Sequence, residues 1–318
     1  MIDNIEIPDK KDWDVAEVNT QIEMRKLSVS SRKTADKRAA ESKLVINEDI
    51  QVTEYAPDVF AFLRQKDGYD NSVLRDSLHP EANKKMVFKA GEGSGKSGSF
   101  FFFSQDQKFI IKTMTEGDFL AFKRIQKKYF QLVSENEDSL LARIYGIYSV
   151  RMEDQSPVKL VVMGNALSGA TGHVGIYDLK GSMVSRIVKG KYKPTATIKD
   201  QNLLLDTQRK TLLRFKASDR RAVMKAMERD VRMLKKFNMM DYSLLFCIQN
   251  NPRYQELKEA GTPVAEINER VQGEFEGNRH SFISECGRYI YRVSIIDYLQ
   301  DYNTSKKLEY FGKVYVLL

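Results

Sequence analysis

The sequence predicts a two-lobed α+β fold with an antiparallel sheet in each lobe and helices flanking the sheets. Three observations support this prediction. A glycine-rich stretch, 91–98, precedes a strand–turn–strand pattern and then a long amphipathic helix. An acidic residue, Asp241, stands between a basic helical run and an apolar, strand-like run. A second strand-like run, 289–296, ends in another acid, Asp297.

The 318 residues divide into an arm and two lobes. Residues 1–45 mix both charges with Ser and Thr and offer little core, which predicts a mobile charged arm. Residues 46–165 form the first lobe, which would bind a nucleotide, and residues 166–318 form the second. Within the second lobe the polar run 250–284 has no clear periodicity, so we expect a disordered insertion there.

Apolar spacing predicts the elements of the first lobe. Helical periodicity covers 55–78, with a break at Gly68, and returns over 116–133. Short apolar or alternating runs predict a hairpin and two further strands, which cover 99–104, 109–112, 144–152 and 158–163.

The second lobe is expected to hold strands and one long helix. The helix covers about 219–237, and a basic loop extends to Asp200. Strands are predicted at 175–179, 182–188, 244–248 and 289–296.

Composition limits the class of partner. The net charge of +8 and the pI near 9.2 predict attraction to an anionic surface, either a membrane leaflet or a nucleic acid. No RNP, KH or zinc-ligand pattern accompanies the charge, so no nucleic-acid partner is expected. No apolar run is long enough to cross a bilayer, which predicts peripheral membrane contact. Two cysteines in apolar or mixed runs, Cys247 and Cys286, predict buried, reduced thiols of an intracellular protein.

The glycines Gly93, Gly95 and Gly98 have the GxGxxG spacing that lets a backbone approach phosphate oxygens. This spacing alone also fits a flexible surface loop. A dinucleotide-binding fingerprint needs a strand before the glycines and a helix after them, and here a strand follows. The run Gly91–Lys96 is one residue too short for a Walker A motif. We therefore expect a glycine-rich β-hairpin that covers a nucleotide.

Lys112 alternates with Ile110 at the end of the following strand. A lysine here would neutralise phosphate charge and would need an acidic partner on the next helix, for which Glu116 and Asp118 are candidates. Without the glycine loop, a strand-terminal lysine is more often a solvated surface residue. We also assign Asn165, at the end of the first lobe, to nucleotide binding.

Three acids of the second lobe are candidate site residues. Taken alone, Asp241 reads as a cap or turn residue and Asp297 as the start of a helix, while Asp178 could form a salt bridge with Lys180. Their order after the glycine loop and Lys112 is typical of a kinase. In that arrangement one aspartate orients or deprotonates the attacking hydroxyl, and another holds Mg²⁺ beside ATP.

Six strings, which lie between Glu54 and Glu309, resemble the phosphatidylinositol phosphate kinases over about four-fifths of the chain. They are GKSGSFFFFS (95–104), FIIKT (109–113), YDLKGS (177–182), MDYSLL (240–245), IIDYLQ (295–300) and KKLE (306–309). The resemblance implies a kinase-like fold in which Lys112 binds ATP, Asp241 is catalytic and Asp297 is the Mg²⁺ ligand.

The resemblance also places Asp178 and Lys180 in the active site, with Lys180 touching phosphate. It implies a flat basic surface on an anionic phosphoinositide membrane, at the cytoplasmic face and most simply at the plasma membrane. A homodimer is left open.

The KKLE string lies at the activation-loop position, where the lipid substrate is chosen. Lys306 and Lys307 would suit an anionic head group. In this family Glu at the position of Glu309 marks enzymes that phosphorylate the 5-hydroxyl, which implies a phosphatidylinositol 4-phosphate 5-kinase. Kinases that act on the 5-hydroxyl of phosphatidylinositol 3-phosphate share KKLE, so that substrate remains open.

Three departures from the family pattern matter. Asn202 and Leu203 replace Asp and Phe of a KDxDF motif, and Gln249 replaces a His. The chain stops nine residues after Glu309, which predicts a truncated activation loop. A membrane-binding pseudokinase without turnover therefore stays open, while a Ser/Thr protein kinase is disfavoured because no HRD-type loop is present.

Overall fold

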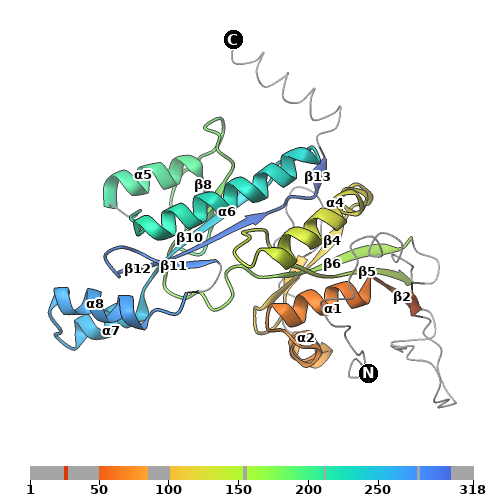
Figure 1. Ribbon diagram of the computed structural model, residues 1–318, viewed down its shortest axis with the longest axis horizontal. Coiled ribbons are helices and arrows are strands. Elements are labelled where there is room, and N and C mark those ends of the chain that lie inside the picture. Colours follow the sequence, from red (N-terminus) through yellow and green to blue (C-terminus); the bar gives the residue numbers. More distant parts are fainter. Residues whose placement is uncertain are drawn as a thin grey trace, which may run out of the picture. The chain divides into compact units, whose positions relative to one another are not determined.

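The structure is a computed structural model that describes residues 25–27, 50–84, 101–152, 156–210, 213–277 and 280–301 (Figure 1). The chain folds into two compact units. Unit 1 comprises Met1–Ser134 with Arg143–Ser168, and unit 2 comprises Glu135–Ala142 with Gly169–Leu318. Each unit is built around its own sheet.

Unit 1 contains a six-stranded antiparallel sheet with the strand order β1-β2-β5-β6-β4-β3. Its strands are β1 (Arg25–Leu27), β2 (Ile50–Tyr55), β3 (Phe101–Phe103), β4 (Phe109–Met114), β5 (Ile144–Met152) and β6 (Val158–Gly164). The predicted hairpin is confirmed, since Phe102 pairs with Ile111 across β3 and β4. Strand β1 falls inside the predicted arm, because Lys26 pairs with Thr53 of β2.

The turn of this hairpin is organised by Asp106. Its carboxylate accepts hydrogen bonds from the Ser77 and Ser104 hydroxyls at 2.6 and 2.7 Å and from the Lys108 backbone N–H at 3.2 Å. Burial alone would raise the pKa of the Asp106 carboxyl, but these hydrogen bonds lower it to about 2. These hydrogen bonds therefore hold the polar residues 105–108, between β3 and β4, in one turn conformation.

The described part of unit 1 contains the helices α1 (Pro57–Lys66), α2 (Asn71–Ser77) and α4 (Glu116–Glu135). The helices expected over 55–78, with a break at Gly68, and over 116–133 are confirmed. Helix α4 begins with reciprocal 3.0 Å hydrogen bonds between Thr115 and Asp118, each side chain accepting from the other residue's N–H.

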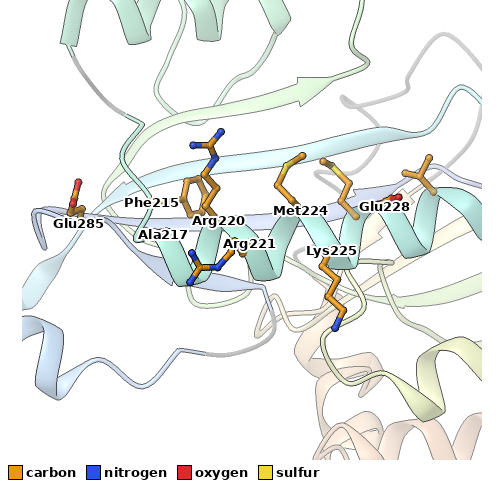
Figure 2. A pocket seen from close by; sticks show the side chains of 10 residues that line it. Phe215, Ala217, Arg220, Arg221, Met224, Lys225, Glu228 and Glu285 are labelled. Carbon is orange, nitrogen blue, oxygen red and sulfur yellow. The ribbon is translucent and has the colours of Figure 1, made fainter.

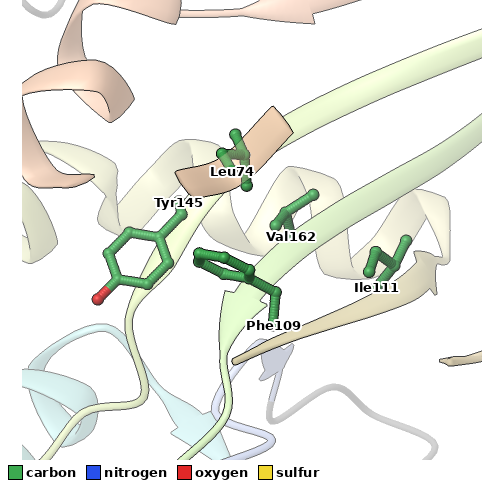
Figure 3. Packing of buried hydrophobic residues seen from close by; sticks show 5 residues of the cluster. All are labelled: Leu74, Phe109, Ile111, Tyr145 and Val162. Carbon is green, nitrogen blue, oxygen red and sulfur yellow. The ribbon is translucent and has the colours of Figure 1, made fainter. Parts of the chain in front are cut away.

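One core cluster of unit 1 lies where strands β4, β5 and β6 meet α2 (Figure 3). It is formed by Leu74, Phe109, Ile111, Tyr145 and Val162. The rings of Phe109 and Tyr145 meet edge to face with centroids 5.9 Å apart. Alternation along β4 sends Phe109 and Ile111 to this core, which fixes the register of the strand that carries Lys112.

Unit 2 contains a five-stranded sheet with the order β11-β12-β10-β7-β8. The strands are β7 (His173–Leu179), β8 (Thr197–Lys199), β10 (Ser243–Asn250), β11 (Ser281–Ile283) and β12 (Tyr289–Ile296). The sheet is mixed, because β8 pairs in parallel with β7 after a long returning loop. A second small ladder joins β9 (Met239–Met240) to β13 (Gln300–Asp301).

Helices α5 (Asp200–Lys210) and α6 (Ala217–Lys236) belong to this unit. Helix α6 corresponds to the predicted long helix, whereas α5 was not predicted. The hydroxyl of Tyr177 on β7 donates to Asp206 at 2.9 Å, which fastens α5 to the sheet. Segment 182–188 is a loop and not the predicted strand, since its polar contacts come from Arg186 and from α5.

The predicted disordered insertion is wrong for its described part. It forms α7 (Pro252–Glu259), α8 (Val264–Glu274) and β11, and Figure 1 shows the two helices side by side. A small buried cluster holds them together: Tyr254, Leu257, Ile267, Val271 and Ile283. Each helix supplies only two buried side chains, so neither is long enough to show a clear apolar period.

Gly287 closes this subdomain and cannot accept a side chain. Its φ is 72°, and a Cβ would lie 2.5 Å from Cγ2 of Val271. We expect Gly287→Ala to lower the free energy of unfolding by about 2–4 kcal/mol, measured by urea denaturation. Gly261→Ala is the control, because φ is 79° there but nothing lies within 4 Å. It isolates backbone strain of about 1–2 kcal/mol, and equal losses in the two variants would contradict the packing argument.

Two further observations bear on the sequence expectations. Among the described residues no helix is both long and apolar enough to cross a bilayer. Cys247 is buried as predicted, whereas Cys286 is exposed, because it lies in the turn between β11 and β12.

Candidate active site

Three adjacent strands of unit 2 bring the predicted catalytic residues to one end of the sheet. Leu244 of β10 faces Leu179 of β7 on one side and Ile295 of β12 on the other. Strand β7 therefore ends, β10 begins and β12 ends at the same place. Lys180 follows β7, Asp241 precedes β10 and Asp297 follows β12.

Asp241 and Asp297 occupy equivalent turns. Both have a left-handed backbone, with φ of 60° and 57°. Met240 pairs with Gln300 in the β9–β13 ladder, and Ser243 pairs with Ile296 in the β10–β12 ladder. The segments that contain Asp241 and Asp297 therefore lie next to each other, between these two ladders. Aspartate tolerates this conformation better than most residues, and unusual backbone angles are often found at functional sites.

Lys180 reaches directly to Asp241. Its Nζ donates a 2.8 Å hydrogen bond to the Asp241 carbonyl oxygen and lies 3.5 Å from the carboxylate Oδ1. The two side chains are 30% and 37% exposed, so both remain accessible to a ligand. Because water screens such an exposed pair, it adds little to the stability of the fold. Its effect is to place a cation beside the Asp241 carboxylate.

Asp178 is held by a partner that the sequence analysis missed. Arg186 donates from Nη2 to Oδ1 of Asp178 at 2.8 Å and from Nε to Oδ2 of Asp200 at 2.7 Å. The predicted Asp178–Lys180 pair is therefore replaced by two separate pairs. Asp178 lies near the site residues, but its carboxylate is used to hold the loop.

Asp200, at the start of α5, fixes the backbone next to Lys180. Its Oδ1 accepts from the N–H groups of Lys180 and Gly181 at 3.0 and 2.9 Å. Burial would raise the pKa of the Asp200 carboxyl, but Arg186 and these hydrogen bonds lower it overall. Burial likewise disfavours the Arg186 cation, yet its two carboxylate partners raise its pKa. The sequence did contain a sign of this role, because Asp200 is the aspartate that follows Lys199 in the KDxDF-like motif.

The departure at Asn202 has a structural use. Its side-chain oxygen accepts from the Val188 N–H and its amide donates to the Val188 carbonyl, both at 2.9 Å. An ionised aspartate could accept but not donate, so Asn202 clamps both backbone groups of Val188. Segment 182–188 is thus tied at Arg186 and at Val188 while its tip stays exposed.

In unit 1, Lys112 lies on β4 between β3 and β6, opposite Val161. The two proposed acidic partners have other contacts. Glu116 forms an ion pair with Lys159, and Asp118 caps the start of α4.

Asn165 follows β6. Its amide donates to the Gln107 carbonyl at 2.7 Å, and its side-chain oxygen accepts from the Leu167 N–H at 3.0 Å. Six predicted site residues lie outside the described residues: Gly93, Gly95, Gly98, Lys306, Lys307 and Glu309.

The donor set fits a metal that is shared with a substrate. In the described part of the chain no three His, Cys, Asp or Glu side chains cluster closely enough to hold an ion alone. Mg²⁺ in kinases is bound by one or two carboxylates and completed by phosphate oxygens and water. The exposed Asp297 carboxylate meets the protein's share of that requirement.

Comparison with known proteins decides the family. The family model described as "Phosphatidylinositol-4-phosphate 5-Kinase" matches residues 82–316, a range that includes Lys112, Lys180, Asp241 and Asp297. The chain belongs to this family. The resemblance carried by the six strings is thereby confirmed, and so is the kinase-like α+β fold.

Similar proteins bear consistent names. A probable phosphatidylinositol phosphate kinase of Dictyostelium discoideum is 34% identical over 206 residues, which are 64% of this chain and 28% of the relative. The phosphatidylinositol 4-phosphate 5-kinase its3 of Schizosaccharomyces pombe is 32% identical over 208 residues, 64% and 27%. Human phosphatidylinositol 4-phosphate 5-kinase type-1 alpha is 30% identical over 296 residues, 84% and 51%. The chain thus spans about a quarter to a half of these relatives.

Proposed function

We propose that the chain is a lipid kinase that transfers the γ-phosphate of ATP to the 5-hydroxyl of phosphatidylinositol 4-phosphate, giving phosphatidylinositol 4,5-bisphosphate. The observation that carries this proposal is the Lys180–Asp241 contact at the sheet end where Asp297 also lies. Membership of the family and the names of the relatives support the substrate class.

Each residue has a distinct task in this mechanism. Asp241 orients the inositol hydroxyl and accepts its proton as the new P–O bond forms. Lys180 places a positive charge next to that carboxylate and contacts the phosphate. Lys112 binds phosphate oxygens of the nucleotide. Asp297 would hold Mg²⁺, which would supply positive charge against the negative charge that develops during the transfer.

Asp178 and Arg186 take a supporting task. They hold the turn that contains Lys180, together with Asp200, so that its ammonium reaches Asp241. Preorganised charge of this kind is more effective than charge that must be moved into place during the reaction.

The deciding experiment measures phosphate transfer from labelled ATP with Mg²⁺ to vesicles that carry phosphatidylinositol 3-, 4- or 5-monophosphate. Product from the 4-phosphate is expected, with Glu309 as the proposed reason. Product chiefly from the 3-phosphate would favour the alternative 5-kinase substrate, and product from the 5-phosphate would contradict a 5-kinase. ATP binding without product from any lipid would favour the pseudokinase module.

We also propose that the protein works at the cytoplasmic leaflet of a membrane, where ATP and anionic lipids are both present. Met183 and Val184, at the tip of the 182–188 loop, are 53% and 52% exposed, an uncommon state for two adjacent large apolar side chains. Three exposed lysines follow along the chain: Lys189, Lys191 and Lys193. Apolar insertion flanked by cations is the usual way in which a peripheral protein holds an anionic leaflet.

Removing the apolar tip should weaken membrane binding. We expect Met183→Ser/Val184→Ser to lower co-sedimentation with vesicles that contain anionic lipid roughly tenfold, because partly exposed side chains no longer leave water. Leu204→Ser/Leu205→Ser on α5 is the matched control, since those residues are also adjacent and exposed. Equal losses in both variants would refute a specific role of the loop.

Light scattering of the pure protein would decide whether it forms a homodimer.

A further inference from the structure

A groove with a volume of about 860 Å³ runs along α6 from Ala217 to Val231 (Figure 2). Its apolar lining comes from Phe215 before the helix and from Met224, Met227 and Val231 on it. Met224 is 53% exposed. The three helix positions are spaced by three and four residues, so they form one continuous stripe.

Cations line the same groove. Arg220, Arg221 and Lys225 are exposed, and within the described residues none of them forms an ion pair. Other arginines of α6 do have acidic partners, as Arg229 has Asp138. The groove is also lined by two acids, Glu228, which pairs with Arg232, and Glu285. Its three cations outnumber these acids, so the groove combines a net positive charge with an apolar stripe, and its complement is a segment that is both acidic and apolar.

The chain contains such a segment at residues 1–20. It carries six acidic side chains and two lysines, a net side-chain charge of −4, in a protein whose overall charge is +8. Its acidic residues are Asp3, Glu6, Asp9, Asp12, Asp14 and Glu17. Large apolar residues alternate with them: Ile2, Ile5, Ile7, Trp13, Val15 and Val18.

We propose that residues 1–20 bind in the α6 groove of the same molecule. The apolar side chains cover Met224, Met227 and Val231, while the acids face the cations on either side of the stripe. The proposal is independent of the lipid kinase activity, because no residue of the candidate active site takes part.

Tethering makes weak complementarity sufficient. A segment tethered to the molecule that carries its site binds in an intramolecular step, with an effective concentration set by the length and stiffness of the linker. Solvent-exposed ion pairs are individually weak and are screened by salt. Binding in cis should therefore be independent of protein concentration and should weaken as the salt concentration rises.

Trp13 is the only tryptophan of the chain, so its fluorescence reports on this segment alone. In the full chain at low salt, we expect its emission to be blue-shifted and less quenched by acrylamide than in a peptide of residues 1–20. Arg221→Glu/Lys225→Glu should move both readings to those of the peptide, with the bound-to-free ratio reduced roughly tenfold. Lys235→Glu/Lys236→Glu makes the same charge change on the same helix outside the groove and should change neither.

A charge exchange provides the decisive variant. Adding Asp12→Lys/Asp14→Lys to Arg221→Glu/Lys225→Glu should restore the blue shift, which a folding defect could not do. Wild-type emission equal to that of the peptide, or unchanged after the groove substitutions, would overturn the proposal. A blue shift that appears only at high protein concentration would assign the groove to another copy and overturn binding in cis. Loss of anionic-vesicle binding in the groove variant, with Trp13 unaffected, would assign the groove to lipid instead.

Discussion

Asp241→Asn is expected to reduce phosphate transfer to lipid by about 10²–10⁴-fold while ATP binding is retained. Asparagine has nearly the same shape and tolerates the left-handed φ of 60°, so the turn before β10 should persist. The Lys180 hydrogen bond to the main-chain carbonyl is also independent of the side-chain charge. The substitution therefore removes a base and leaves its surroundings in place.

Two measurements make this prediction specific. Initial rates with vesicles that contain phosphatidylinositol 4-phosphate give the loss of turnover, and titration with a fluorescent ATP analogue shows that the nucleotide still binds. Turnover near the wild-type rate would remove Asp241 from the mechanism. Loss of both turnover and nucleotide binding would indicate damage to the fold, which thermal unfolding of the variant would show directly.

The second large effect concerns stability. Asp230 on α6 is fully buried, and its Oδ2 accepts from the Leu140 N–H at 2.6 Å and from the Ser139 hydroxyl at 3.0 Å. Its Oδ1 lies 3.1 Å from Nε of Arg229. Asp230→Ala should lower the free energy of unfolding by about 3–5 kcal/mol, because it leaves two buried donors and a cation without this partner.

Asp230→Asn is the comparison for this effect, since its side-chain oxygen still accepts from the Leu140 N–H, while the charge is lost and an amide NH₂ replaces the Oδ1 that accepts from Arg229. Burial raises the pKa of the Asp230 carboxyl, and Arg229 and the hydrogen bonds only partly oppose this. The folded chain thus holds this proton more tightly than the unfolded chain. The contribution of Asp230 to stability should then fall as pH rises past its unfolded pKa, and the asparagine variant should lack that dependence. Equal urea midpoints for wild type and Asp230→Ala would contradict the prediction.

Local periodicity was a good guide to regular elements. The hairpin of β3 and β4, the interrupted helices α1 and α2, and the long helices α4 and α6 all have apolar spacings that persist over their whole length. The same reasoning placed Asp241 and Asp297 beside adjacent strands, because each acid borders an apolar run that had to be buried.

The errors have a common physical cause. The 182–188 segment alternates enough to suggest a strand, yet Asn202 and Asp200 each bind it from 14 residues away in the chain. The α7–α8 pair is stabilised by a cluster in which no single helix shows a period. Arg186 was overlooked for the same reason, since its importance comes from two carboxylates that meet only in the folded chain.

The left-handed turns at Asp241 and Asp297 also restrict which substitutions can be interpreted. Most residues with a side chain lose about 1–2 kcal/mol in this conformation, whereas Asp, Asn and Gly are the residues that adopt it most readily. Glutamate would keep the charge but would strain the main chain, so its failure would say little about chemistry.

The same restriction acts during evolution. At these two positions the left-handed backbone conformation disfavours most amino acids, whether or not the protein is catalytically active. A lineage that loses the activity should therefore drift first to asparagine or glycine at 241 and 297, and such residues would be a recognisable trace of a former enzyme.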